Sequence, residues 1–111
     1  MNITSKPWGY EILLEHNEDY AVKILHVAPQ QSLSLQLHTI KRESMYVLKG
    51  DGTIQLGTTA RALGLGQIVT IEPGTKHRLL AGPRGIEVLE VSTPELDDLI
   101  RITDAYGRVD G

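Results

Sequence analysis

The sequence contains no cysteine among its 111 residues. A disulfide framework, thiolate metal ligands and a cysteine nucleophile are therefore excluded. No apolar run approaches the roughly 20 residues that a membrane-spanning helix needs, and residues 1–6 lack the apolar stretch of a signal peptide. These absences predict a cytoplasmic protein that does not enter a membrane.

Basic segments are also scarce. The chain has 11 Lys and Arg against 14 Asp and Glu, a net charge of −3, and no run of basic residues. Nucleic-acid binding depends on clustered positive charge. The sequence therefore predicts no nucleic-acid partner.

What the sequence does contain is a series of short strands separated by Gly and Pro. The length fits one domain, and a hydrophobic content of 41% is enough for a core. Residues 50–52, Gly-Asp-Gly, predict a hairpin, and residues 82–85 predict another turn. Residues 95–100 predict a short helical turn, followed by an irregular tail. Strands are expected at residues 10–14, 20–28, 32–38, 43–49, 53–56, 58–63, 67–71, 77–80 and 86–91. This pattern is typical of an all-β antiparallel sandwich or barrel.

Four polar residues form a candidate metal site. Gln36 and His38 are two residues apart, so on a strand they point to the same face. Glu43 follows a short polar bend, and His77 follows a Pro-Gly turn. Imidazole and oxygen ligands suit one divalent ion, such as Zn, Mn, Co, Ni or Fe. The alternative is four unrelated polar residues, but their joint spacing favours a metal site.

Both segments keep the spacing of the two cupin motifs, and the chain resembles that superfamily. In the first motif, Gln36-Leu37-His38 precedes four residues, Glu43, six residues and Gly50. In the second, Pro73-Gly74 precedes two residues and His77. The positions that differ from the cupin pattern are Gln30 for Gly, Gln36 for His, Glu72 for Pro and Ala81 for Asn. The resemblance implies a cupin double-stranded β-helix, a jelly-roll barrel, formed by residues 1–111 as a single domain.

The chain further resembles the cupin part of the type II mannose-6-phosphate isomerases, which is often fused behind a mannose-1-phosphate guanylyltransferase. Gln36 in place of the first cupin His is one shared feature. The other shared segments are Pro7-Trp8-Gly9, Leu33-Ser34-Leu35-Gln36-Leu37-His38, Gly74-Thr75-Lys76-His77-Arg78-Leu79, Asp97-Asp98-Leu99-Ile100-Arg101 and Tyr106-Gly107-Arg108.

This resemblance implies a metal-dependent aldose–ketose isomerase that interconverts mannose 6-phosphate and fructose 6-phosphate. The reaction needs a Lewis acid on the sugar oxygens, a base near the carbon and cations for the phosphate. Lys76 and Glu90 are candidate bases or proton carriers. The candidate substrate-binding residues are Lys41, Arg78, Arg101 and Arg108, although each could be an ordinary surface charge.

Two other functions stay open. A metal-binding cupin could act as an oxygenase or another sugar isomerase, or the domain could be a non-catalytic carbohydrate-binding or partner module. Residues 39–44 favour the last alternative, because they replace the His-His-Arg-Ala-Glu-His of the family. Exposed sheet edges are commonly covered by a second chain, so a homodimer is expected.

Overall fold

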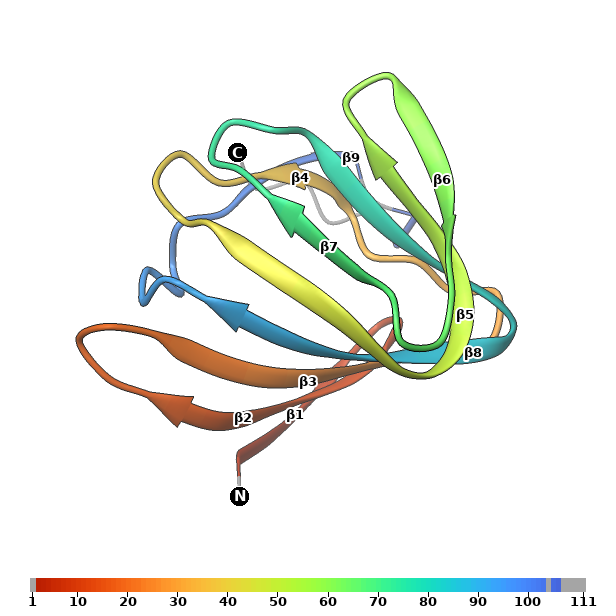
Figure 1. The fold of residues 1–111 in the computed structure, drawn as a ribbon, viewed down its shortest axis with the longest axis horizontal. Helices are drawn as coiled ribbons and strands as arrows, with labels where there is room; N and C mark the ends of the chain where they lie inside the picture. The colour runs from red at the N-terminus through yellow and green to blue at the C-terminus, as the bar shows by residue number, and fades with distance from the viewer. Residues whose placement is uncertain (1, 104, 107–111) are drawn as a thin grey trace.

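The computed structural model describes residues 2–103 and 105–106, and this part of the chain consists of strands and turns without a helix (Figure 1). The all-β prediction is therefore confirmed. Within these residues, no helix is long or apolar enough to cross a membrane. The strands are β1 (Asn2–Lys6), β2 (Gly9–His16), β3 (Ala21–Val27), β4 (Leu35–Leu37), β5 (Glu43–Leu56), β6 (Thr59–Leu63), β7 (Ile68–Ile71), β8 (His77–Ser92) and β9 (Ile100–Thr103).

Two long strands, β5 and β8, pair with each other and connect the two halves of a curled sheet (Figure 1). The end of β8 pairs with β3, which continues through β2 to β1, and the start of β5 pairs with β7. The start of β8 pairs with β4, which continues to β9, and the end of β5 pairs with β6. All of these pairings are antiparallel, and the side chains between the two halves form the interior.

The prediction of turns at residues 50–52 and 82–85 is wrong. Residues 50–52 lie inside the long strand β5, and residues 82–85 lie inside the long strand β8. The glycines instead allow the two strands to bend together. Gly50 has a φ of +75°, and a Cβ atom there would lie 2.2 Å from the carbonyl oxygen of Gly85, whose own φ is +80°. Glycine is needed where backbones approach this closely in a left-handed conformation. The Gly-rich segments of β5 and β8 therefore mark a bulge at which both strands cross from one half of the sheet to the other.

The core fills the middle of the barrel and gives way to polar residues at one end. Inward positions alternate along β5 and β8, as strand geometry requires. The buried apolar residues are Trp8, Leu25, Val27, Leu33, Met45, Val47, Ile54, Leu63, Val69, Ile71, Leu79, Ala81, Ile86 and Val88. The same inward rows end in Glu43, His77 and Glu90, which are also buried. The period-2 pattern thus carries polar side chains to the open end of an apolar barrel.

The C-terminal segment differs from expectation. Residues 95–100 form tight turns and not a helical turn, and the tail expected to be irregular contains β9, which pairs with β4. The physical reason is tertiary, because Asp98 is held by hydrogen bonds to the segment after β4. Arg108 lies outside the described residues.

Candidate metal centre and adjoining cavity

Three of the four predicted metal ligands converge at the open end of the barrel. His38 follows β4, while Glu43 and His77 are the first residues of β5 and β8. Oε1 of Glu43 lies 3.0 Å from Nε2 of His38 and 3.0 Å from Nε2 of His77. The three candidate ligand atoms lie within 4.8 Å of one another, and all three residues are buried. His38 and His77 are 39 positions apart in the sequence, and the fold brings both into contact with Glu43.

Backbone contacts orient both imidazoles for metal binding. Nδ1 of His77 is 2.8 Å from the carbonyl oxygen of Thr75, and Nδ1 of His38 contacts the carbonyl oxygen of Asp98. A carbonyl can only accept, so each Nδ1 donates its proton and Nε2 is the nitrogen of each ring that is turned toward the candidate metal position. Metal-binding histidines usually donate their other ring N–H to a backbone carbonyl in this way. Both Nε2 atoms lie 3.0 Å from Oε1 of Glu43, so a divalent cation placed among them would have two imidazole nitrogens and a carboxylate oxygen as ligands. The residues present therefore fit a metal ion.

Glu43 supplies the negative charge of this group. Burial by itself raises the pKa of Glu43, but interactions with Glu90, with the two histidines and with the Lys41 ammonium outweigh it and hold the pKa far below its usual value. Ionised carboxylate oxygen is the form that coordinates a metal. Glu43 is therefore available as a ligand over the whole physiological pH range.

Gln36 lies on the same face as the histidine ligands. It is directly opposite His77 in the β4–β8 pairing, and directly opposite residues of a pair share a face. Its Oε1 accepts a hydrogen bond of 2.8 Å from the hydroxyl of Ser34. Gln36 also lines the cavity beside His38. It is therefore placed next to the three converging residues, with its amide oxygen held by Ser34.

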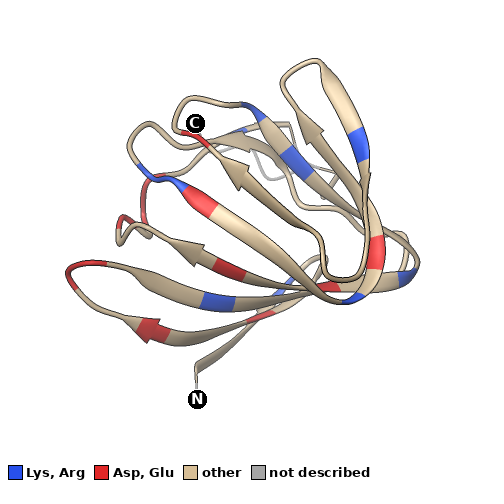
Figure 2. Cartoon of the chain, in the orientation of Figure 1, with Lys and Arg blue, Asp and Glu red and all other residues tan. Residues whose placement is uncertain are grey.

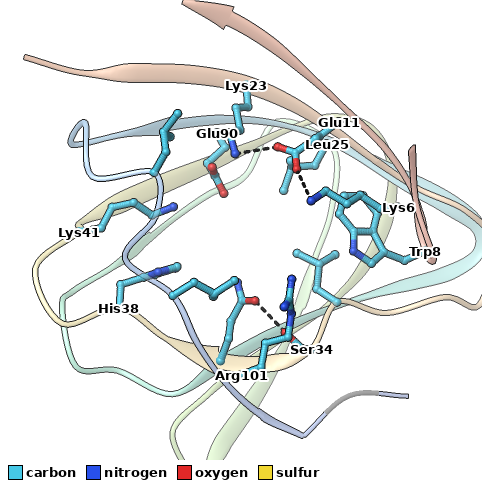
Figure 3. A pocket seen from close by; sticks show the side chains of 14 residues that line it. Lys6, Trp8, Glu11, Lys23, Leu25, Ser34, His38, Lys41, Glu90 and Arg101 are labelled. Carbon is cyan, nitrogen blue, oxygen red and sulfur yellow. Dashed lines mark hydrogen bonds and ion pairs between the residues drawn. The ribbon is translucent and has the colours of Figure 1, made fainter. Parts of the chain in front are cut away.

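A cavity of about 130 Å³ opens beside the candidate metal centre (Figure 3). Of the predicted catalytic and substrate-binding residues, Lys41, Glu90 and Arg101 line it. Nζ of Lys41 lies 3.8 Å from Oε2 of Glu43. Arg101 is brought to the cavity by β9, where it pairs opposite Gln36.

Glu90 is a buried carboxyl in this cavity. Burial raises its pKa well above the ordinary value, and the nearby negative charge of Glu43 raises it further, against smaller opposing effects of Lys41 and Lys23. Figure 2 shows a basic residue on β3 and acidic residues on the neighbouring strands β8 and β5 at this end of the barrel. The pKa values of the two buried carboxyl groups are thus shifted in opposite directions, with that of Glu90 raised and that of Glu43 lowered.

The remaining predicted residues lie elsewhere. Lys76 is exposed, because it alternates with the inward-facing His77. Arg78 is turned toward β9, where its Nη2 donates a hydrogen bond of 2.7 Å to the hydroxyl of Thr103. Neither residue lines the cavity.

Asp98 lies at the candidate site, although its sequence position does not indicate a place there. Its carboxylate accepts hydrogen bonds from the backbone amides of Thr39, Ile40 and Lys41, at 3.0, 2.6 and 2.8 Å. Partial burial acts to raise the pKa of Asp98, and these hydrogen bonds outweigh it and lower the pKa far below its usual value. Asp98 thereby clamps the segment that carries His38. Its sequence signal was membership of the acidic pair in the tail, which does not reveal the loop it contacts.

A second unanticipated group lines the cavity from the first three strands. Lys6 and Lys23 both form ion pairs with Glu11. Nothing in their sequence spacing indicates this contact, since it depends on the pairing of β1, β2 and β3.

Comparison with solved structures shows that the chain has the cupin fold. The chain superposes on KdgF from Halomonas sp. with a TM-score of 0.81 at 18% identity, covering 88% of this chain and 92% of that one. It superposes on a cupin-2 domain from Rhodospirillum rubrum with a TM-score of 0.77 at 21% identity, covering 86% and 66%. Oxalate decarboxylase from Bacillus subtilis gives a TM-score of 0.80 at 18% identity, covering 91% and 30%. At these identities the likeness establishes the fold, which confirms the predicted double-stranded β-helix.

The chain belongs to the family described as "Mannose-6-phosphate isomerase C-terminal", which it matches over residues 2–104. It is 32% identical over 108 residues to the mannose-1-phosphate guanylyltransferase ManC of Salmonella typhimurium, covering 94% of this chain and 22% of that protein. It is 32% identical over 107 residues to the xanthan biosynthesis protein XanB of Xanthomonas campestris, covering 93% and 23%. The chain thus spans less than a quarter of the length of these curated relatives.

Proposed function

We propose that this domain is a metal-dependent sugar-phosphate isomerase that interconverts mannose 6-phosphate and fructose 6-phosphate. The observation that carries the proposal is the convergence of two correctly oriented imidazoles and an ionised carboxylate beside a cavity lined by cations. Membership of the mannose-6-phosphate isomerase C-terminal family supports the choice of sugar.

His38, Glu43 and His77 would hold the metal, with Gln36 as a fourth candidate. A bound divalent ion supplies Lewis acidity toward the sugar oxygens at C1 and C2. Glu90 lines the cavity and has a raised pKa, so it suits the transfer of a proton between these two carbons. Lys41 and Arg101 place positive charge on the same cavity, where the negative charge of an enediolate would be stabilised.

The test is a coupled assay that follows fructose 6-phosphate formation from mannose 6-phosphate. The protein is treated with chelator and then reloaded separately with Zn, Mn, Co, Ni or Fe. We expect turnover that disappears with chelator and returns with at least one metal, and that is lost in Glu90→Gln. Absence of turnover with every metal would reject the isomerase assignment.

A non-catalytic carbohydrate-binding module is the second candidate. The observation in its favour is that residues 39–44 lack the three histidines that the family pattern has in this segment. For this candidate, the metal-loaded protein binds mannose 6-phosphate in a calorimeter but produces no fructose 6-phosphate. Oxygen uptake in the presence of Fe would point instead to oxygenase chemistry at the same residues.

A further inference from the structure

We propose that Lys6 and Lys23, held by Glu11, form the subsite that binds the phosphate group of the substrate, on the side of the cavity away from His38. This proposal rests on the proposed function for the identity of the sugar phosphate. It concerns residues on β1, β2 and β3, separate from the three candidate metal ligands.

Ion pairs hold the side chains of Lys6, Glu11 and Lys23 together. Nζ of Lys6 lies 3.1 Å from Oε1 of Glu11, and Nζ of Lys23 lies 2.7 Å from Oε2. Each carboxylate oxygen therefore holds one ammonium group, and the group of three carries a net positive charge. Burial acts to raise the pKa of Glu11, but the two lysines lower it below its usual value, so the carboxylate stays ionised. Glu11 fixes both ammonium groups without neutralising the pair.

All three residues face inward. Glu11 is directly opposite the buried Leu25 in the β2–β3 pairing, and Lys23 is two residues from Leu25 on the same strand. Thr4 is opposite Glu11 in the β1–β2 pairing, and Lys6 is two residues from Thr4. Because strand side chains alternate, all of these positions belong to the inner face. The side chains are 14 to 28% exposed, so a ligand can reach them from the cavity.

The two lysines have a defined place relative to the candidate metal centre. In Figure 3, Lys6 lies on the side of the cavity opposite His38 and Lys41, and Lys23 lies beside Glu90. A hexose 6-phosphate has its reacting carbons and its phosphate at opposite ends. With C1 and C2 at the metal centre, the phosphate must reach a cationic group on the far side of the cavity. Lys41 is less suitable, because it lies on the same side of the cavity as His38, where the reacting carbons would be placed.

Chemistry favours a phosphate over a neutral sugar hydroxyl at this subsite. Lysine ammonium groups bind phosphate as point charges, and each can donate hydrogen bonds to more than one oxygen. The group of two lysines and Glu11 has a net charge of +1, which attracts a phosphate dianion placed between the two ammonium groups. Neutral mannose has no charge to place there.

The experiment measures binding without relying on turnover. Metal-loaded protein is titrated calorimetrically with mannose 6-phosphate, mannose and inorganic phosphate. For the double variant Lys6→Met/Lys23→Met we expect the affinity for mannose 6-phosphate to fall by roughly tenfold or more, as the loss of charge-assisted hydrogen bonds predicts. Lys49→Met removes the same charge from an exposed position on β5 and should change the affinity by less than about twofold.

Several outcomes would overturn the proposal. They are unchanged mannose 6-phosphate affinity in the double variant, equal loss in Lys49→Met, or wild-type binding of mannose as tight as that of mannose 6-phosphate. Inorganic phosphate that binds as tightly as mannose 6-phosphate would also reject a sugar-phosphate subsite. If the double variant does not fold, the single variants Lys6→Met and Lys6→Arg are compared instead. Lys6 is the more exposed of the two lysines, and Lys6→Arg retains the positive charge. We expect loss in the first and retention in the second, and the reverse result rejects the proposal.

The outcome is separable from that of the proposed function. Lysine-dependent binding of mannose 6-phosphate without turnover would keep the subsite and reject the isomerase. Turnover by the double variant at the wild-type KM would keep the isomerase and reject the subsite.

Discussion

The two sides of the cavity solve different problems. Next to one side, which His38 lines, the residues His38, Glu43 and His77 are at most 3% exposed and their candidate ligand atoms converge. On the other side, Lys6, Glu11 and Lys23 are partly exposed and are already ion-paired. Buried nitrogen and carboxylate ligand atoms are costly unless a cation or another partner satisfies them. Partly exposed ion pairs, by contrast, are weakened by solvent and can exchange partners with a ligand. Under the two proposals made above, the comparison predicts a tightly held metal ion on one side and an exchangeable anion on the other.

The largest effect should come from removing one buried ligand. We expect His77→Ala to reduce the metal content from about one ion per chain to nearly none, since each structural ligand contributes to affinity. Elemental analysis after dialysis measures this directly. His26→Ala is the matched control, because His26 stacks on Tyr10 and lies outside the cavity. Retained metal in a His38→Ala/His77→Ala double variant would show that the site has been assigned to the wrong residues.

The next effect should come from the clamp that positions His38. Asp98→Ala removes the acceptor of three backbone amides, and we expect metal affinity to fall about 10- to 100-fold, the usual range for outer-shell partners. Asp98→Asn keeps one side-chain oxygen and should recover part of the loss. Competition with a chelator dye measures the affinity.

Asp97→Ala, at the exposed neighbouring position, is the control for the clamp. A purely structural role would lower the thermal midpoint of Asp98→Ala while leaving the metal affinity of the folded protein unchanged, which would contradict the prediction.

Salt should separate the two sides further. Raising the ionic strength from about 0.05 M to about 0.5 M shortens the Debye length severalfold. We expect mannose 6-phosphate affinity to drop by several-fold, because Lys6 and Lys23 are solvent-accessible. Metal occupancy at the buried centre should stay constant over the same range. Paired titrations with ligand and with metal give both responses, and equal responses would remove the distinction between the two sides.

The smallest effect should be the pH dependence contributed by Glu11. Its pKa is lowered in the folded protein, so the folded state binds fewer protons than the unfolded state near the ordinary Glu pKa of about 4.3. The resulting stabilisation is complete above that pH and is lost as the pH falls through the lowered value. Urea unfolding in chelator should show wild type more stable than Glu11→Gln at about pH 7, with the difference shrinking by about pH 3.5.

The control for this measurement is Glu18→Gln, at an exposed turn position. It should show no comparable change with pH. A difference between wild type and Glu11→Gln that grows as the pH falls would contradict the assigned direction of the shift.

Much of the fold and of the metal centre could be predicted because their signals are local. Alternation along residues 43–49 and 86–91 indicates strands with one buried face. The same alternation places Gln36 and His38 together, and the spacing to Glu43 and His77 matches the cupin motifs. These features need only the two-residue period of a strand.

Long-range pairing decided the rest. Residues 50–52 have the composition of a hairpin, yet they lie inside β5, because the partner strand β8 bends at the same place. Lys76 is adjacent to a ligand in sequence but faces outward, whereas Asp98 is 60 residues from His38 and contacts it.

The sequence by itself determined that the chain is all-β and that two histidines and a glutamate share the inner face of one barrel. Only the tertiary structure decided what lies across from them. Lys6, Glu11 and Lys23 meet because β1, β2 and β3 pair side by side, and β3 meets the other half of the cavity through β8. Strand periodicity is written into neighbouring residues, but the choice of partner strand depends on burying the apolar faces of the whole chain together.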